Sequence, residues 1–234
     1  RSVHPFSWDG ENWIPNPIIL PPPSVNQRAS FPSGIAIEGD RLVVGSIFVN
    51  GQGSAYLYTW DGEQWTEKER IQPERPLGNA DFFGSDIALN ASDVLIGSRF
   101  EDHGFTDTER RGGVVYLSGK KIFPSGSVGD QGFGSHVALG KDLAFVSTKF
   151  YYFYTFRKTG DHWQQESVIG GSVSSNNPSM DASGSRVIMG YAKANTRVSA
   201  VSLRSGKVSI FDVNVTELGG REIENDFTIE FESI

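Results

Sequence analysis

The stretch Phe83-Gly-Ser-Asp-Ile-Ala-Leu89, followed by Ser92-Asp-Val-Leu-Ile-Gly-Ser98, decides the fold, because the chain repeats it. Related copies begin at Phe31 and Phe133, 52 residues before and 50 residues after Phe83. A degraded fourth copy runs from Met180 to Gly190. In the first three copies, a strand with alternating apolar residues precedes a strand that is apolar throughout. A unit of about 50 residues with several short strands is typical of a β-propeller blade.

A second repeated element follows the first. Phe6-Ser-Trp-Asp-Gly-Glu-Asn-Trp13 returns as Tyr58-Thr-Trp-Asp-Gly-Glu-Gln-Trp65, and a degraded copy runs from Phe156 to Trp163. Each copy predicts a strand, a glycine-containing hairpin turn and a second strand that begins at tryptophan. The two elements together give about four strands per repeat.

The middle of each repeat predicts close packing between neighbouring sheets. Leu42-Val43-Val44 is apolar at every position, which favours a strand buried on both faces. A small residue follows it in every copy (Gly45, Gly97, Ser147 and Gly190), as expected where two backbones approach closely. One blade cannot cover both of its own faces, so we expect the copies to stack around an axis.

These observations predict an all-β protein with one domain, residues 1–234. We expect a β-propeller of about five four-stranded antiparallel blades, closed by pairing of the N- and C-terminal strands; a larger ring, cut short, is the alternative. The expected repeats lie near residues 27–78, 79–129, 130–173 and 174–225. Residues 1–26 and 226–234 would complete the first blade, so that no sheet edge stays exposed.

Composition excludes several classes of function. The chain contains no cysteine, which rules out disulfides, thiolate metal sites and cysteine nucleophiles. It has 21 Lys and Arg residues against 28 Asp and Glu residues and no dense basic cluster, so we expect no nucleic-acid partner. No apolar run approaches the roughly 18 residues that a membrane-spanning helix needs, so we expect no membrane insertion.

The repeated cassette resembles the FG-GAP repeat. Its best copy runs from Phe83 to Leu117 and includes Gly112-Gly-Val-Val-Tyr-Leu117. That repeat builds the propeller of integrin α-subunits and of many bacterial and algal surface proteins. The resemblance implies a propeller that binds a protein partner or joins a larger complex, and a secreted, cell-surface or otherwise extracytoplasmic location.

The resemblance also directs attention to one acidic loop. Integrin-type repeats often bind calcium through an Asp-x-Asp-x-Asp-Gly loop, and no such run is present, so we expect no cofactor. The nearest segment contains Glu101, Asp102, His103 and Asp107, of which Glu101 and Asp102 come closest to metal ligands. Arg110 closes the loop and would pair with one of these two acids. We interpret the five residues as a partner-binding loop; a solvated acidic loop is the alternative, and a calcium site is a less favoured one.

The tryptophans allow a second kind of site. Trp60 and Trp65 could stack against sugar rings, whereas their recurrence at equivalent positions favours packing between blades. No histidine spacing typical of zinc sites and no nucleophile or phosphate-binding motif is present. We therefore expect a non-catalytic protein-interaction or assembly module that makes contact through residues 98–112. A lectin-like propeller that binds glycans is the first alternative. A glycosidase-like enzyme, with two carboxylates across a central cleft, is a distant third.

Overall fold

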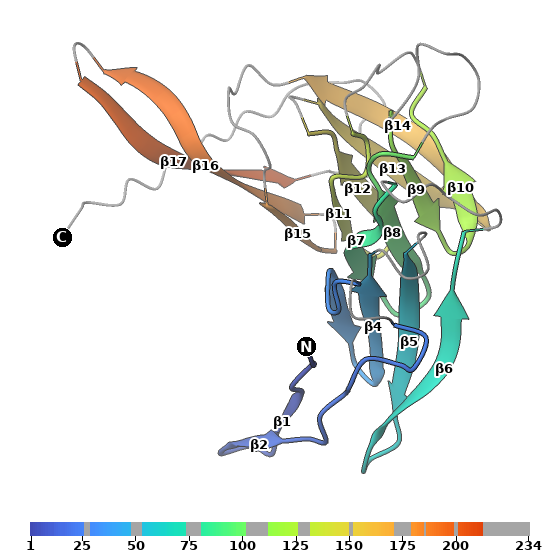
Figure 1. Cartoon of the computed structure of the whole chain (residues 1–234). Coiled ribbons are helices and arrows are strands. Elements are labelled where there is room, and N and C mark those ends of the chain that lie inside the picture. The colour runs from blue at the N-terminus through green and yellow to red at the C-terminus, as the bar shows by residue number, and fades with distance from the viewer. Residues whose placement is uncertain are drawn as a thin grey trace.

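A computed structural model describes residues 1–25, 29–47, 53–73, 81–101, 112–125, 132–149, 152–170, 179–184, 186–198 and 201–212. The described residues form strands and no helix, which confirms the all-β prediction (Figure 1). They accordingly include no helix that is long and apolar enough to cross a membrane.

Three four-stranded antiparallel sheets and one three-stranded sheet follow one another along the chain. Sheet 1 contains β3 (Ile35–Glu38), β4 (Arg41–Ser46), β5 (Ser54–Trp60) and β6 (Trp65–Ile71). Sheet 2 contains β7 (Phe83–Leu89), β8 (Val94–Ser98), β9 (Val114–Leu117) and β10 (Lys120–Ile122). Sheet 3 contains β11 (His136–Leu139), β12 (Leu143–Ser147), β13 (Tyr152–Thr159) and β14 (His162–Gly170). Sheet 4 contains β15 (Ser179–Ser183), β16 (Arg186–Val198) and β17 (Val201–Asp212).

Within each sheet the strands pair in chain order, as expected of propeller-like blades. A separate N-terminal hairpin consists of β1 (Phe6–Trp8) and β2 (Trp13–Pro15). Its register matches the outer half of sheet 1, because Trp8 lies opposite Trp13 just as Trp60 lies opposite Trp65. The hairpin therefore has the same register as the two outer strands of sheet 1.

The core lies between successive sheets. Val43 and Ala55 of sheet 1 pack against Ile87 and Leu89 of sheet 2, and clusters of the same kind join sheet 2 to sheet 3 and sheet 3 to sheet 4. The second strand of each of the first three sheets is buried on both faces, as its uninterrupted apolar sequence predicts.

Glycine at the end of the second strand allows neighbouring sheets to approach, as the sequence predicts. A Cβ atom on Gly45 would overlap the carbonyl oxygen of Gly84, and a Cβ atom on Gly97 would overlap that of Gly134. The obstructing atom belongs to the backbone of β7 in the first case and to the turn just before β11 in the second. The spacing between sheets therefore depends on the missing side chain at these two positions.

The described sheets do not form a closed ring. The first strands β3, β7, β11 and β15 contact one another in succession, so the series has two ends, one at sheet 1 and one at sheet 4. Residues 226–234, expected to close the ring, lie outside the described residues. Five blades and a closed ring thus stay predictions.

Candidate functional site

Both ends of the series carry exposed apolar side chains that no other sheet among the described residues covers. Ile37 of sheet 1 is 57% exposed, whereas Leu89 and Leu139, which occupy the same register position in sheets 2 and 3, are 8% and 6% exposed. At the other end, Ile188 of sheet 4 is 48% exposed. Its counterparts Val43, Leu95 and Phe145 are fully buried. Within the part of the chain that the structure describes, each end therefore lacks the neighbouring sheet that sheets 2 and 3 have on both faces.

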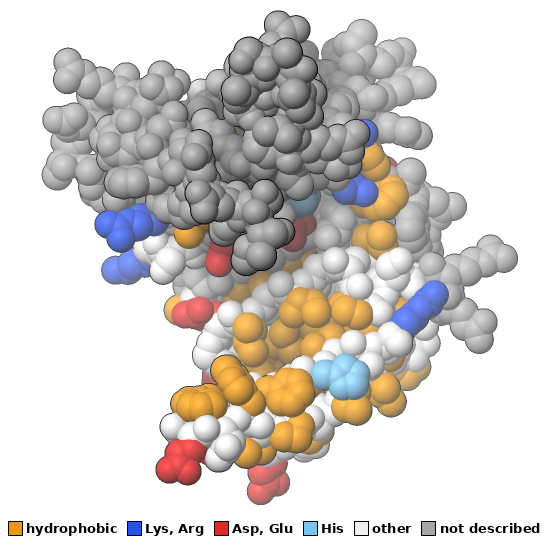
Figure 2. All heavy atoms as spheres, turned by 90° about the vertical axis from the view of Figure 1, so that its left-hand side faces the viewer, with side chains coloured by type: hydrophobic (Ala, Val, Ile, Leu, Met, Phe, Trp, Pro, Cys, Tyr) orange, Lys and Arg blue, Asp and Glu red, His pale blue; other side chains and the backbone are white. Residues whose placement is uncertain are grey.

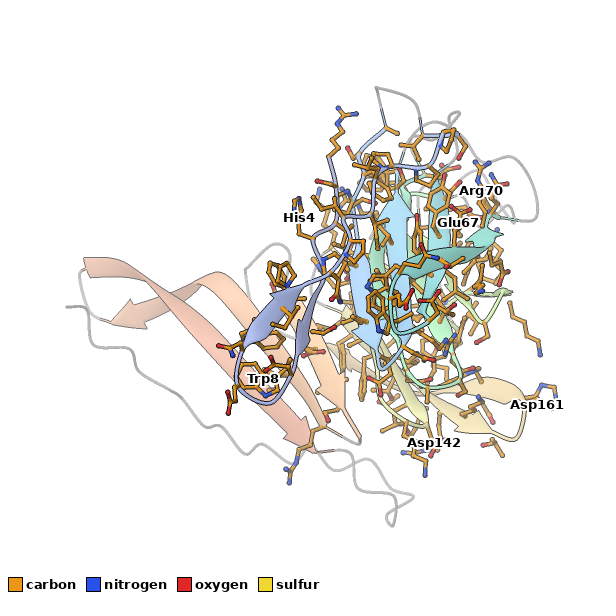
Figure 3. All side chains as sticks on the ribbon, turned by 90° about the horizontal axis from the view of Figure 1, so that it is seen from below. His4, Trp8, Glu67, Arg70, Asp142 and Asp161 are labelled. Atoms are coloured by element: carbon orange, nitrogen blue, oxygen red, sulfur yellow. The ribbon has the colours of Figure 1, made fainter. Side chains whose placement is uncertain are left out.

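The N-terminal hairpin belongs to the same uncovered region. Phe6, Trp8 and Trp13 are all more than half exposed, although Tyr58, the counterpart of Phe6, is buried. Figure 2, which views the molecule from the left-hand side of Figure 1, shows apolar side chains gathered on the face turned toward the viewer. Seen from below, the hairpin that carries Trp8 falls between sheet 4 and sheet 1 (Figure 3). An exposed apolar region of this kind marks an interaction surface or an unfilled packing position.

The two indole pairs have similar geometry. The ring centroids of Trp8 and Trp13 are 5.4 Å apart at an angle of 55°, and those of Trp60 and Trp65 are 5.5 Å apart at 46°. Trp60 and Trp65 are partly buried, and Trp65 packs against the cluster that contains Leu42. Trp60 and Trp65 thus contribute to packing in sheet 1, and a ligand contact by them stays a prediction, whereas Trp8 and Trp13 are more than half exposed.

The hairpin turns are held by aspartate. Oδ1 of Asp61 accepts hydrogen bonds from the backbone N–H groups of Glu63 and Gln64, 2.9 and 2.8 Å long. Asp9 binds Glu11 and Asn12 in the same way. The hydrogen bond from Asn12 and then that from Glu11 lower the pKa of Asp9, because the backbone N–H groups favour the charged carboxylate. Both turns therefore present their tryptophans on a fixed backbone.

The acidic loop begins at a buried residue. Glu101 is 1% exposed, and its two carboxylate oxygens accept hydrogen bonds of 2.9 and 3.0 Å from the Tyr116 hydroxyl. Lys121 forms an ion pair with the same carboxylate. The backbone N–H of Gly113 donates to the carbonyl of Glu101 over 3.1 Å, which ties the two ends of the loop together. Glu101 thus anchors the loop inside the fold.

The other predicted loop residues, Asp102, His103, Asp107 and Arg110, lie outside the described residues. Within the part of the chain that the structure describes, no three His, Asp or Glu side chains gather as they would around a metal ion. Glu101 is occupied by Tyr116 and Lys121.

A polar pair between the inner strands was missed by sequence reasoning. Oδ2 of Asp86 on β7 accepts a 2.9 Å hydrogen bond from the backbone N–H of Val137 and lies 3.5 Å from Nδ1 of His136 on β11. Both side chains are partly exposed. Asp86 and His136 each follow the repeat phenylalanine by three residues, and this shared offset is the signal that could have paired them.

The pair lies near Arg99, whose guanidinium stacks over the rings of Phe82 and Phe100. Burial lowers the pKa of Arg99, and the charge of Asp86 opposes that shift. The contacts of Asp86 with Val137 and His136 join sheet 2 to sheet 3, whereas those of Arg99 with Phe82 and Phe100 lie at the ends of β7 and β8. They supply neither a nucleophile nor a pair of carboxylates.

No family model and no curated protein matches the chain. Among solved structures, it is similar to the computationally designed protein Ika4, with a TM-score of 0.47, 9% identity, and coverage of 81% of this chain and 94% of that one. It is also similar to the SapL1 lectin bound to α-methyl fucoside (TM-score 0.46, 11% identity, 91% and 69% coverage). A third structure, named as a 6-phosphogluconolactonase from Bacteroides uniformis, gives a TM-score of 0.46 at 13% identity, with coverage of 91% and 75%. Likenesses this low decide nothing about function.

Proposed function

We propose that this chain is a non-catalytic, FG-GAP-like propeller module that binds another protein or joins a larger assembly outside the cytoplasm. The proposal takes the chain as one domain of about five four-stranded blades. Residues 1–26 and 226–234 contribute to the same blade, through which the N- and C-terminal strands close the ring.

The architecture is supported by the repeat equivalence of the exposed residues. Ile35 and Ile37 at one end of the series and Ile188 at the other are exposed, and at these ends no further sheet is found among the described residues. The N-terminal hairpin has the register of the outer half of a blade. One blade built onto this hairpin would cover both ends.

The single observation that carries the binding function is the apolar surface of the N-terminal segment. Trp8, Trp13, Ile18 and Leu20 are 53%, 66%, 54% and 68% exposed, and they lie within 13 residues of the sequence. Aromatic and aliphatic side chains of this kind form the centre of protein interfaces. Residues 102–111 are the second contact region of this proposal, and the hydrogen bond between Gly113 and Glu101, which flank them, supports it.

The test is affinity capture from the native source with three forms of the full chain. The wild type should enrich the same partner in repeated captures, and the double variant Trp13→Ser, Leu20→Ser should reduce that enrichment by about tenfold or more. The control is Val168→Ser, which changes an apolar side chain on sheet 3 that is 44% exposed. Equal enrichment by all three forms would count against the apolar surface, and a deletion of residues 103–109 tests the loop in the same assay.

The exposed indole pair supports the lectin alternative, because two tilted rings beside a fixed carboxylate can stack on a sugar and bind its hydroxyls. Asp9 and the pair Trp8 and Trp13 provide these groups. A glycan array decides the matter. Binding that disappears in Trp8→Ala would favour the lectin, and a blank array at high protein concentration would exclude it.

A further inference from the structure

The turn between β7 and β8 is shaped by Asn90. Its side-chain oxygen Oδ1 accepts hydrogen bonds from the backbone N–H groups of Ser92 and Asp93, 2.9 and 2.7 Å long. The Ser92 hydroxyl donates to the same oxygen over 3.3 Å. An asparagine that bonds to the backbone a few residues further on is typical of a tight turn. The oxygen of this amide therefore serves sheet 2.

The nitrogen of the same amide reaches sheet 3. Nδ2 of Asn90 donates a 2.7 Å hydrogen bond to the carbonyl oxygen of Gly140 and a 3.3 Å hydrogen bond to that of Lys141. These two residues lie in the turn between β11 and β12, together with Asp142, which Figure 3 labels. This turn is the counterpart, in the next sheet, of the turn that contains Asn90. One side chain thus joins two successive sheets.

The turn at Asn90 also receives a contact from sheet 1. Nη1 of Arg41, the first residue of β4, donates to the carbonyl oxygens of Asn90 and Ala91 over 3.0 and 2.8 Å. Both links have the same direction, because each runs from a side chain of one sheet to backbone carbonyl groups of the next. Asn90 is therefore the middle of a row of contacts that joins three sheets.

The sequence gives the amide nitrogen a second possible use. Asn90-Ala-Ser92 is an Asn-x-Ser acceptor sequence for N-glycosylation. In that reaction Nδ2 forms a bond to C1 of a sugar, the bond between C1 and the phosphate of a nucleotide- or lipid-linked sugar donor breaks, and the amide loses one proton. The atom that would carry the glycan is thus the atom that bonds to sheet 3.

The two uses of this nitrogen exclude each other. A transferase has to bring a sugar carbon within bonding distance of Nδ2, and two carbonyl oxygens of sheet 3 already lie 2.7 and 3.3 Å from it. Both oxygens belong to the backbone, which cannot rotate away as a side chain can. Access to Nδ2 therefore requires sheets 2 and 3 to open locally. After transfer, the bulky sugar hinders the turn at Gly140 and Lys141 from packing back.

We propose that Asn90 is an N-glycosylation site that accepts a sugar only while sheet 3 is not packed on sheet 2. The attached glycan then prevents the two sheets from stacking. Folding and modification compete for one nitrogen atom, and the one that comes first excludes the other. This inference goes beyond the proposed function, because it concerns the assembly of the fold and requires no partner.

The first test measures the rate of transfer to Asn90. The full chain carries Asn214→Gln, which removes the other acceptor sequence. It is incubated with a purified N-glycosyltransferase and a nucleotide sugar, and the product is followed by mass spectrometry. A synthetic peptide of residues 85–97 is the accessible reference. The native chain should react at least about a hundredfold more slowly than the peptide, because transfer waits for local opening. Equal rates would overturn the proposal.

A matched pair of variants locates the opening. Leu139 is buried in the cluster between sheets 2 and 3, so Leu139→Ala should raise the rate of transfer to the native chain at least about tenfold. Val168→Ala, at an exposed position of sheet 3, should leave the rate unchanged. If circular dichroism shows that Leu139→Ala does not fold, the smaller change Leu139→Val takes its place. A folded Leu139 variant that reacts like the wild type would contradict the proposal.

Hydrogen exchange tests the effect of the glycan. The backbone N–H of Val137 donates to Asp86 between sheets 2 and 3, whereas that of Ser118 donates to Val94 within sheet 2. In the chain that carries a sugar on Asn90, the Val137 amide should exchange at least about tenfold faster than in the unmodified chain, and the Ser118 amide should change less. Equal protection of Val137 in both chains would show that glycan and packing coexist, and the proposal would fail.

Discussion

Replacing Gly97 by alanine tests the packing of sheet 2 against sheet 3. The new Cβ atom would overlap the carbonyl oxygen of Gly134 and would lie 3.3 Å from the carbonyl carbon of the same residue. Both atoms belong to a backbone that cannot rotate away, so the two sheets must separate. Overpacking of this kind costs about 1–3 kcal/mol, and the upper part of that range applies because no side chain can yield. For a chain of this size, about 3 kcal/mol lowers the melting temperature by roughly 6–12 °C.

The assay is thermal unfolding followed by circular dichroism, with Ser147→Ala as the matched control. Ser147 holds the same repeat position as Gly97 and already carries a Cβ atom. The control should therefore melt within about 2 °C of the wild type. A Gly97→Ala variant that melts like the wild type would show that these backbones are not in contact, and the blade-stacking argument would fail.

Three further predictions concern polar groups. Burial raises the pKa of Asp93, but hydrogen bonds from Lys158, Ser92 and Ser118 outweigh it and hold the pKa below 3.8. Asp93 therefore stabilises the fold at pH values above about 4 and loses that contribution as the pH falls lower. The melting temperatures of the wild type and Asp93→Asn should converge between about pH 5 and pH 2. Melting temperatures that keep a constant difference over this range would refute the prediction. Lys121→Met should lower the free energy of unfolding, measured in urea, by about 3 kcal/mol, because it leaves the Glu101 carboxylate buried without its cation. The control Lys120→Met, at an exposed position of the same strand, should leave the free energy of unfolding unchanged. Asp61→Ala should cost about 1 kcal/mol by removing two hydrogen bonds to the turn, and an unchanged urea midpoint would contradict the role of that turn.

The sheets could be predicted from the sequence because the hydrophobic pattern of each repeated strand matches the way in which that strand is buried. The continuous apolar run at Val94–Ser98 became a fully buried strand, and Gly45 and Gly97 lie where backbones meet. In these segments one physical requirement, burial on both faces, determines residue type and conformation together.

The candidate site was harder to predict because it depends on exposure and on contacts between repeats, which the repeat pattern does not specify. The pattern of Ile35-Ala-Ile37 resembles that of its copies, so its exposure could not be predicted from the pattern; it arises because no described sheet packs against this face. Glu101 was expected in a partner-binding loop, and only the fold brings it to Tyr116 and Lys121, which lie 15 and 20 residues further along the chain. Asp86 and His136 meet because two repeats stack in a register that the sequence does not state.

The central claim is that a blade built on the N-terminal hairpin lies between sheet 4 and sheet 1. Because the chain contains no cysteine, a pair of cysteines at Phe6 and Ile188 can be joined by a short bis-maleimide. The counterparts of Phe6 and Ile188 are Phe156 and Leu95, which belong to one buried cluster between sheets 2 and 3. The cysteines at positions 6 and 188 should therefore cross-link efficiently within a single chain under native conditions and poorly in urea. A cysteine pair at Ile35 and Ile188, which a whole blade would separate, should react much less. Equal, low reaction of both pairs in the native protein would contradict the closed arrangement.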